Sequence, residues 1–245
     1  MFKPIFHAIL RQAPESVQGA LAYFYKPELR SSWGGPLNGQ SHRQLVVQEI
    51  FRFFNPEYVL ETGTFRGTTT EFFSTITNAK ILSVESSAYL FGYAKARFWL
   101  NQKVTLFKGD SRAFLRDFLL DAHASRVFIY LDAHWDNDLP LLEEIDIVFS
   151  STSSCVVMID DFEVLDDAGY LYDDYGVGGA LDVNYIRDVV DKWKLTGFYP
   201  SVSSMAESGA KRGSIVLANE PAVVRQLHSL DSLRAIQWPI AALSR

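Results

Sequence analysis

Acidic side chains close two neighbouring apolar runs in the middle of the chain. The run 127–131 is followed by Asp132, and the run 154–159 ends at Asp160 and Asp161. If both runs are strands of one parallel sheet, their carboxyl ends meet at one edge and the three carboxylates converge there. Gathering like charges is costly unless a cation lies between them, and a hard divalent cation such as Mg²⁺ is the simplest candidate. The alternative is that Asp132 and Asp160 are separate strand-end acids, each satisfied by a helix N-terminus.

A second chemical feature is a turn that carries two glycines four residues apart, Glu61-Thr62-Gly63-Thr64-Phe65-Arg66-Gly67-Thr68. Gly63 allows the backbone to turn sharply beside a ligand, and Gly67 permits close packing of a strand against a helix. The spacing differs from the dinucleotide fingerprint G-x-G-x-x-G, which disfavours a pyrophosphate and a nicotinamide-dependent oxidoreductase. Glu61 instead suits a cationic ligand that carries an amino group, and S-adenosylmethionine is such a ligand.

Two further acidic positions follow the next two apolar runs. Glu85 closes the run 80–84, where a carboxylate could accept both hydroxyls of a ribose. The run 104–107 leads into Asp110 and Ser111, near the position that an adenine edge would occupy. Each feature alone is weak, but their order and even spacing together favour one ligand lying across successive strand ends.

The elements that must position these residues alternate regularly along the chain. A helix with apolar positions Leu45, Val46, Ile50 and Phe53 begins near a serine cap at Ser41. Five short apolar runs follow, each succeeded by a helix-compatible segment; they cover 58–61, 80–84, 104–107, 127–131 and 154–159. We then expect a helix over 179–193 and an antiparallel pair of strands, 195–199 and 214–218. This order predicts an α/β, Rossmann-like, doubly wound and mostly parallel sheet.

Between residues 41 and 218 the sequence resembles the class I S-adenosylmethionine-dependent methyltransferases. The resemblance implies a seven-stranded sheet with a reversed last strand, within a methyltransferase domain at 41–245. Two short amphipathic patterns, at 5–12 and 15–25, separately predict an N-terminal helical cap or lid at 1–40. The resemblance also implies a cofactor site whose residues are Glu61, Gly63, Thr64, Gly67, Thr68, Glu85, Asp110, Ser111 and Asp132.

Within that family, the acidic strand ends resemble those of the metal-dependent O-methyltransferases, both the catechol type and those that modify sugars or antibiotics. The resemblance implies that Asp132, Asp160 and Asp161 hold Mg²⁺, and that the metal activates a hydroxyl for methyl transfer. His134 is the candidate general base, and with Asp132 it forms the candidate catalytic pair. The lysine that the catechol type has after the strand-four acid is absent, so His134 could instead be a metal neighbour or a structural hydrogen-bond donor.

Composition restricts the partners. The net charge of −6 and the pI near 5.4 disfavour a nucleic-acid partner, and no apolar stretch is long enough to span a membrane. The single cysteine, Cys155, fits a reducing, cytoplasmic compartment. We expect a small-molecule hydroxyl acceptor such as a sugar, a phenol or a natural product, held by aromatic residues, and an apolar N-terminal cap that could support a homo-oligomer. The aromatic candidates are Tyr23, Phe24, Tyr25, Trp33, Trp135, Tyr170, Tyr172 and Tyr175.

Two other functions are compatible with parts of the sequence. Residues 132–136 satisfy D-A-H-x-D, a pattern of dinuclear-metal amidinohydrolases, although the upstream Gly-Gly-Asp-His and the later D-x-D of those enzymes are missing. A non-catalytic module could also keep the S-adenosylmethionine pocket and bind a partner through the aromatic cap.

Overall fold

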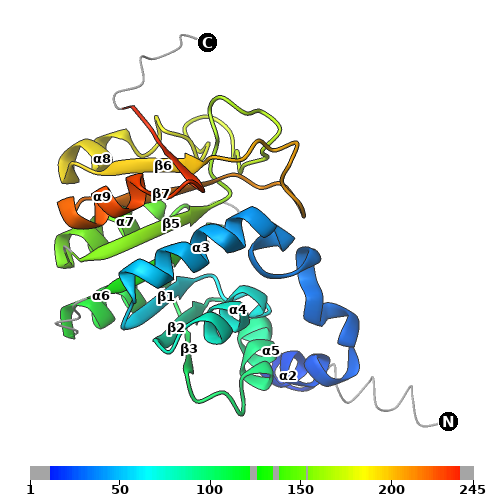
Figure 1. The fold of residues 1–245 in the computed structure, drawn as a ribbon. Helices are drawn as coiled ribbons and strands as arrows, with labels where there is room; N and C mark the ends of the chain where they lie inside the picture. Colours follow the sequence, from blue (N-terminus) through cyan, green and yellow to red (C-terminus); the bar gives the residue numbers. More distant parts are fainter. Residues whose placement is uncertain (1–11, 122–125, 135–137, 153, 238–245) are drawn as a thin grey trace.

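The computed structural model describes residues 12–121, 126–134, 138–152 and 154–237. Within these residues eight strands form one sheet in the order β3-β2-β1-β4-β5-β7-β6-β8 (Figure 1). The strands are β1 (Tyr58–Thr62), β2 (Lys80–Glu85), β3 (Val104–Lys108), β4 (Val127–Leu131), β5 (Cys155–Asp160), β6 (Thr196–Pro200), β7 (Ser214–Ala218) and β8 (Leu233–Ala235). None of the described helices has the length and hydropathy needed to cross a bilayer.

Strands β1 to β5 run parallel, with β1 paired to both β2 and β4. Strand β7 is antiparallel to β5 and to β6, which confirms the reversed strand and the closing antiparallel pair. The chain adds β2 and β3 on one side of β1 and then crosses to β4 on the other side, so the topological switch point lies between β1 and β4. Ligands of open α/β sheets bind at the carboxyl edge at such a point. The loops after β1, β4 and β5 all start from that edge.

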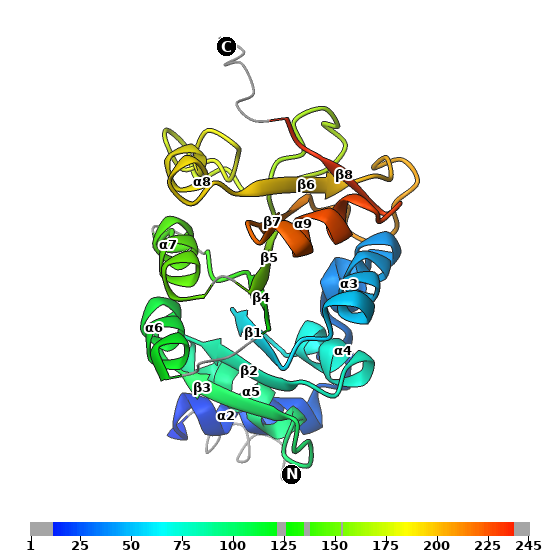
Figure 2. The same ribbon diagram turned by 60° about the vertical axis from the view of Figure 1, so that its left-hand side comes forward.

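Helices cover both faces of the sheet, as Figure 2 shows. They are α3 (Ser41–Phe54), α4 (Thr68–Ile76), α5 (Ala88–Arg97), α6 (Ser111–Asp121), α7 (Leu141–Ser151), α8 (Arg187–Trp193) and α9 (Pro221–His228). Alternate residues of each strand face opposite ways, so the core has two halves. One half packs α6, α7 and α8 against residues such as Leu60 and Ile129, and the other packs α3, α4 and α9 against residues such as Val59 and Phe128.

The N-terminal helix α2 (Glu15–Tyr25) lies against α5 rather than over the sheet edge (Figures 1 and 2). The two backbones meet at glycines. A Cβ on Gly19 would stand 1.8 Å from the carbonyl oxygen of Tyr89, and one on Gly92 would stand 1.8 Å from that of Ser16. Short 3₁₀ turns, η1 (Pro27–Gly34) and η2 (Pro36–Gly39), then lead from α2 to α3. The first predicted helix of the cap, at residues 5–12, falls almost wholly outside the described residues.

Three expectations about elements need correction. The sheet has an eighth strand, β8, on the outer edge of β6, so the count of seven strands is wrong. The helix expected over 179–193 forms only at α8 (Arg187–Trp193), because the buried apolar residues before it lie in turns that fill the core without helical spacing. Helix α3 begins at Ser41 as expected, but its cap position is Gln40 and no side chain caps it.

Candidate active site

The glycine turn after β1 approaches the end of β4 closely. Gly63 has φ of +82°, and a Cβ there would lie 2.1 Å from the carbonyl oxygen of Asp132. The backbone N–H groups of Gly63 and Thr64 both donate to Val84 O, at 3.0 and 3.1 Å. Gly67 also has a positive φ, +75°, and occupies the cap position of α4. Only glycine fits Gly63, because both its φ and the neighbouring backbone exclude a side chain.

Glu61 is held rigidly below this turn. Its side chain is 1% exposed, and its Oε2 accepts hydrogen bonds from the hydroxyls of Thr70 and Ser83. The Ser83 hydroxyl is also 2.6 Å from that of Thr64. Burial raises the pKa of Glu61 to about 7, and the hydroxyls of Ser83 and Thr70 limit the rise. A positively charged group in the pocket would therefore stabilise the ionised form.

The other predicted cofactor acids have different surroundings. Glu85 is 7% exposed, and it accepts hydrogen bonds from the N–H groups of Phe65 at 2.7 Å and Ser87 at 2.8 Å. It is thus oriented by the turn itself. Asp110 is a cap of α6, because its Oδ1 accepts from the N–H groups of Arg112 and Ala113. The Arg112 guanidinium also bonds Asp110 and lowers its pKa.

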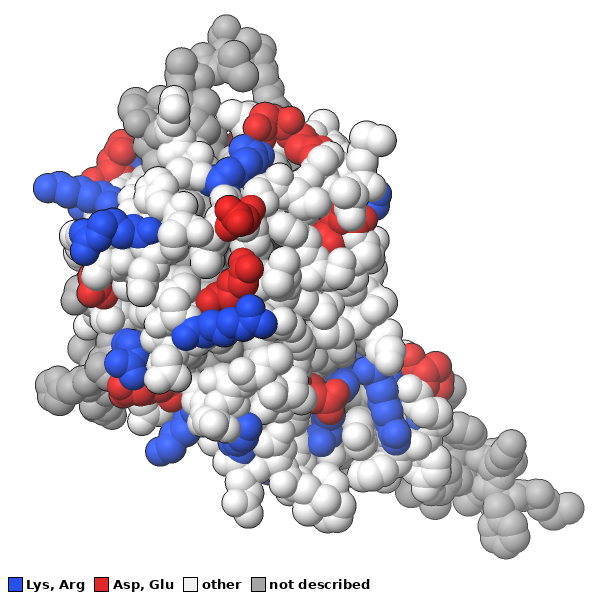
Figure 3. Space-filling view, viewed as in Figure 1, with Lys and Arg blue, Asp and Glu red and all other residues white. Residues whose placement is uncertain are grey.

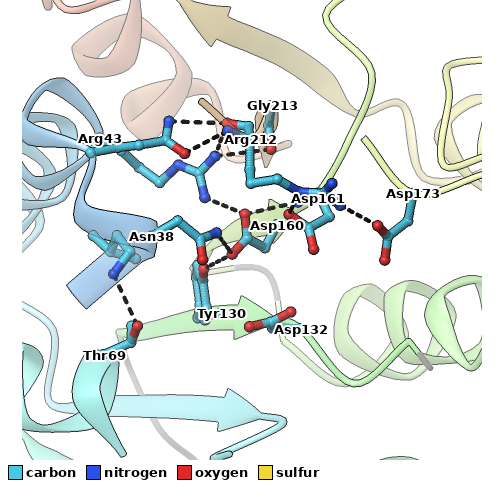
Figure 4. Close-up of polar contacts among 12 residues, drawn as sticks. Asn38, Arg43, Thr69, Tyr130, Asp132, Asp160, Asp161, Asp173, Arg212 and Gly213 are labelled. Carbon is cyan, nitrogen blue, oxygen red and sulfur yellow. Dashed lines mark hydrogen bonds and ion pairs between the residues drawn. The ribbon is translucent and has the colours of Figure 1, made fainter. Parts of the chain in front are cut away.

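Asp160 lies at the centre of a buried polar network (Figure 4). The side chain of Asp160 is 3% exposed and that of Arg43, its ion-pair partner, 1%. The Asp160 Oδ1 accepts from Arg43 and, at 2.8 Å, from the N–H of Asp161. The Oδ2 accepts from the Asn38 amide at 3.0 Å and from the Tyr130 hydroxyl. Burial alone would raise the pKa of Asp160, but these partners outweigh it and the pKa is lowered.

A second arginine serves the neighbouring acids. Arg212 Nε donates to Asp161 Oδ1 at 2.6 Å, and its Nη2 pairs with Asp173. Arg43 in turn donates to the backbone carbonyls of Arg212 and Gly213. Burial and the charge of Asp160 raise the pKa of Asp161 to about 7, although Arg212 opposes the rise. Asp161 itself has φ of +53°, a backbone conformation that non-glycine residues rarely adopt.

His134 faces this acidic group from the loop after β4. Asp132, His134 and Asp161 each offer a ligand atom, and these atoms lie within 4.8 Å of one another. The His134 Nε2 is 3.9 Å from Asp132 Oδ1 and 4.0 Å from Asp173 Oδ2. Neither ring nitrogen has a hydrogen-bond partner among the described residues, and burial lowers the pKa of the imidazole. Asp132 is 35% exposed to the pocket, and partial burial with the charges of Asp160 and Asp161 raises its pKa well above the ordinary value.

One pocket connects the turn after β1 with the acidic strand ends. Its wall includes Glu61, Gly63 and Thr64 from the turn, Asp132 from β4 and Asp160 from β5; the remaining wall residues are Trp33, Gly35, Asn38, Phe65, Thr68 and Thr69. Trp33 is 68% exposed.

The segment 33–39 closes one side of this pocket in an unusual backbone conformation. Positive φ angles occur at Trp33, Leu37 and Asn38 as well as at three glycines. The segment is fixed by hydrogen bonds from Leu37 N–H to Thr69 Oγ1 at 3.1 Å and from Ala210 N–H to Asn38 O at 2.9 Å. Strained backbone of this kind persists where the surroundings hold it, and such positions gather at functional sites.

The structure thus brings most of the predicted acids to one edge but groups them differently. The ligand role predicted for Asp160 finds no support in this geometry, because both of its oxygens accept from other groups. His134 stands beside Asp132 and Asp161 in its place. Asp110 and Ser111 are not among the residues that line the pocket, and Asp110 serves as a helix cap.

Several site residues were missed from the sequence. Arg43 shares the buried face of α3 with Val46, Val47 and Ile50, so a charged residue in phase with an apolar stripe was the signal. Asp173 lies in an acidic stretch, 166–174, whose tyrosines were acceptor-wall candidates but whose acids matched no motif, and Arg212 had no signal at all. Trp135 and Asp136, candidates for the acceptor wall and for the amidinohydrolase pattern, fall outside the described residues. Tyr170 is 2% exposed and packs in the core.

No family model and no curated protein matches the sequence. Solved structures match its fold. An O-methyltransferase from Bacillus cereus, solved in complex with S-adenosylhomocysteine (SAH), superposes with a TM-score of 0.54 at 14% identity, over 84% of this chain and 92% of its own. The O-methyltransferase TomG from Streptomyces achromogenes, involved in tomaymycin synthesis and solved with S-adenosylmethionine (SAM), gives 0.53 at 17% identity, over 85% and 92%. At these identities the likeness shows a shared fold.

Proposed function

We propose that this chain, which has the class I methyltransferase fold, is an enzyme that moves a methyl group from S-adenosylmethionine to a hydroxyl of a small molecule, assisted by a divalent cation. The carrying observation is that a single pocket is lined both by the glycine turn after β1 and by the acids that end β4 and β5. A donor held by the turn would have its reactive end beside those acids. We assign residues 41–245 to the methyltransferase domain and 1–40 to its cap.

The turn fits the donor. Glu61 offers a buried carboxylate to the amino group of the methionine moiety, and Gly63 leaves room where a Cβ would collide. Glu85 lies at the adjoining strand end, where its carboxylate can accept ribose hydroxyls while Phe65 N–H and Ser87 N–H fix its orientation. The sulfonium charge of the donor also suits a pocket whose ionisable wall residues are acids.

The charges of the site favour a cation. Among the described residues four carboxylates gather around it, those of Asp132, Asp160, Asp161 and Asp173, and two guanidinium groups pair with them, those of Arg43 and Arg212. Two negative charges therefore remain when all four acids are ionised, and a divalent ion balances them. A bound cation would lower the pKa of an acceptor hydroxyl and fix its oxygen for attack on the methyl group. Mg²⁺ is the ion that the resemblance to the metal-dependent O-methyltransferases implies for this role.

The segment 33–39 suits a polyhydroxylated or flat acceptor. Trp33 lines the pocket and is 68% exposed, and Asn38 lines it with an amide whose nitrogen also donates to Asp160. Aromatic faces pack well against sugar rings and against planar rings, and amides bind hydroxyls. These features support a sugar, a phenol or a natural product of similar chemistry as the acceptor class.

The proposal is tested in two steps. Calorimetry should first detect binding of S-adenosylmethionine and of S-adenosylhomocysteine, and no binding of either would refute the proposal. The protein is then incubated with labelled donor, divalent cation and a panel of catechols, sugars and hydroxylated polyketides. We expect transfer to at least one hydroxyl, strongly reduced in Asp132→Asn and unchanged in Asp117→Asn, which alters an exposed acid on α6. Donor binding without transfer to any acceptor would instead identify a non-catalytic module.

A further inference from the structure

We propose that His134 is a metal ligand rather than the general base, and that the site therefore selects a divalent first-row transition ion over Mg²⁺. The inference rests on the proposed function for its biological role, but not for its test. It predicts one imidazole nitrogen and the carboxylates of Asp132 and Asp161 as the ligands that the protein supplies.

The imidazole of His134 is buried without a described hydrogen-bond partner. The His134 side chain is 1% exposed, and neither Nδ1 nor Nε2 has a hydrogen-bond partner among the described residues. Buried polar groups of a folded protein are nearly always bonded, since an unbonded one costs about 1–3 kcal/mol. A structural hydrogen-bond donor would have an acceptor within reach, and His134 has none among the described residues. A bound ion would give one of its unbonded nitrogens a partner.

The distances from His134 to the neighbouring carboxylates suit a shared ion. The His134 Nε2 faces Asp132 Oδ1 at 3.9 Å and Asp173 Oδ2 at 4.0 Å. These separations are too long for hydrogen bonds. Two ligand atoms that each lie about 2.1 Å from one ion are separated by roughly 3–4 Å, depending on the angle at the metal. Asp132, His134 and Asp161 are spaced within 4.8 Å, so small adjustments bring all three to one ion.

Two neighbouring acids, Asp160 and Asp173, are already engaged by other groups. Both oxygens of Asp160 accept from other groups, so Asp160 offers little to an ion. Asp173 is similarly engaged, because its Oδ1 pairs with Arg212 and its Oδ2 accepts from the Tyr175 hydroxyl at 2.6 Å. The same hydroxyl lies 3.2 Å from His134 O, which ties Asp173 to the backbone that carries the imidazole. Asp173 is thus a positioning residue.

The ligand types then indicate the ion. Mg²⁺ prefers oxygen ligands and gives up its water reluctantly, whereas imidazole nitrogen suits transition ions. A set of one imidazole and two carboxylates should therefore bind Mn²⁺ or Co²⁺ more tightly than Mg²⁺. The burial of His134 also argues against a base, which must reach the proton of a bound acceptor.

The test uses the full chain, stripped with a chelator and free of donor and acceptor. Mn²⁺ is titrated by calorimetry, and the Mn²⁺-loaded protein is examined by pulsed electron paramagnetic resonance for ¹⁴N coupling from a directly bound imidazole. We expect one site, a ¹⁴N signal, and Mn²⁺ affinity at least about tenfold above that for Mg²⁺. In His134→Gln the ¹⁴N signal should vanish and Mn²⁺ affinity should fall about tenfold or more, since even outer-shell losses cost 10–100-fold.

His228→Gln is the matched control, because His228 is exposed on α9 and packs against Phe198; it should leave the signal and the affinity unchanged. A wild-type spectrum without ¹⁴N coupling from imidazole would overturn the inference. This measurement does not depend on whether a variant folds. Unchanged Mn²⁺ affinity in His134→Gln with lost turnover would also overturn it, in favour of the base role. Failure of donor binding would refute only the proposed function, because the metal measurements are made without donor.

Discussion

Removing the Arg43 guanidinium should destabilise the protein strongly, because it leaves the Asp160 carboxylate buried without its counter-charge. Arg43 and Asp160 are 1% and 3% exposed at their side chains, so solvent cannot replace the lost partner. Breaking such a buried pair costs about 3–5 kcal/mol. For a chain of this size 1 kcal/mol corresponds to about 2–4 °C in Tm, so Arg43→Met should lower Tm by about 6–20 °C.

The size of the loss should depend on pH. The folded-state pKa of Asp160 is lowered, so its contribution to stability is present above the unfolded pKa near 4 and is lost as the pH falls through the folded pKa. Without Arg43 burial dominates, the pKa rises, and the ionised carboxylate destabilises the variant at neutral pH. The difference between wild type and Arg43→Met should therefore be largest near pH 7 and shrink as the pH falls toward 4.

Urea denaturation at several pH values measures these differences, and a double-mutant cycle with Asp160→Asn isolates the pair. The double variant should lose clearly less than the sum of the two single losses. Lys192→Met is the control, since Lys192 and Asp146 form a pair with side chains 55% and 44% exposed and should contribute at most about 1 kcal/mol. A loss in Arg43→Met no larger than in the control, or an additive cycle, would refute the account of this network.

Three further outcomes are expected. Gly63→Ala should abolish donor binding in calorimetry, because the new Cβ would meet backbone at 2.1 Å, while Gly109→Ala, with open space at its Cβ, should bind normally. Glu144 is fully buried and its pKa is raised by burial to about 7, with hydroxyls nearby limiting the rise; its contribution to stability is lost as the pH rises from its unfolded value of 4.5 toward 7. Glu144→Gln should thus gain stability relative to wild type between pH 5 and pH 8 by urea denaturation, and a constant difference would contradict this. Asn38→Ala should unfold more easily than Asn38→Gly, which keeps the left-handed backbone (φ +59°) while losing the same amide; equal losses would mean that the amide alone matters.

The central sheet was predictable because its strands are short, apolar and separated by helix-compatible segments. Strands β1 to β5 end within a residue or so of the predicted runs, and their buried faces leave little choice of register. β8 escaped prediction because Leu233–Ala235 is three residues long and has no alternation to recognise. The expected helix over 179–193 shows the opposite error: Leu181, Val183 and Ile186 are buried, but in turns.

The candidate site was predictable only to the extent that strand ends define it. The convergence of Asp132 and Asp161 follows from parallel strands, because residues at their carboxyl ends share one edge. The partner of each acid depends instead on contacts between distant segments. Arg43 reaches Asp160 across 117 residues of sequence, and Asp173 reaches Arg212 across 39. No local pattern encodes such pairs. Which acids pair with an arginine, and which lie beside His134, is therefore seen only in the folded chain.

Charged side chains of both signs are interspersed over the face shown in Figure 3. The ion pairs on the described surface, such as Arg112 with Asp110 and Asp138, join exposed or half-exposed groups. Pairs of this type contribute at most about 1 kcal/mol each and weaken with salt. Raising the salt concentration should therefore lower the free energy of unfolding by less than Arg43→Met does.

The glycine contact between α2 and α5 has a consequence for the wall of the pocket. Gly19 and Gly92 bring the two helices to backbone contact at one end of the segment 26–40, and Asn38 is bonded to Asp160 at the other. Because the segment 26–40 is held at both ends, it cannot rotate outward as a hinged lid. A large molecule can then pass Trp33 only if the residues between the two held ends bend outward. Gly34 and Gly35 supply the backbone freedom for such bending.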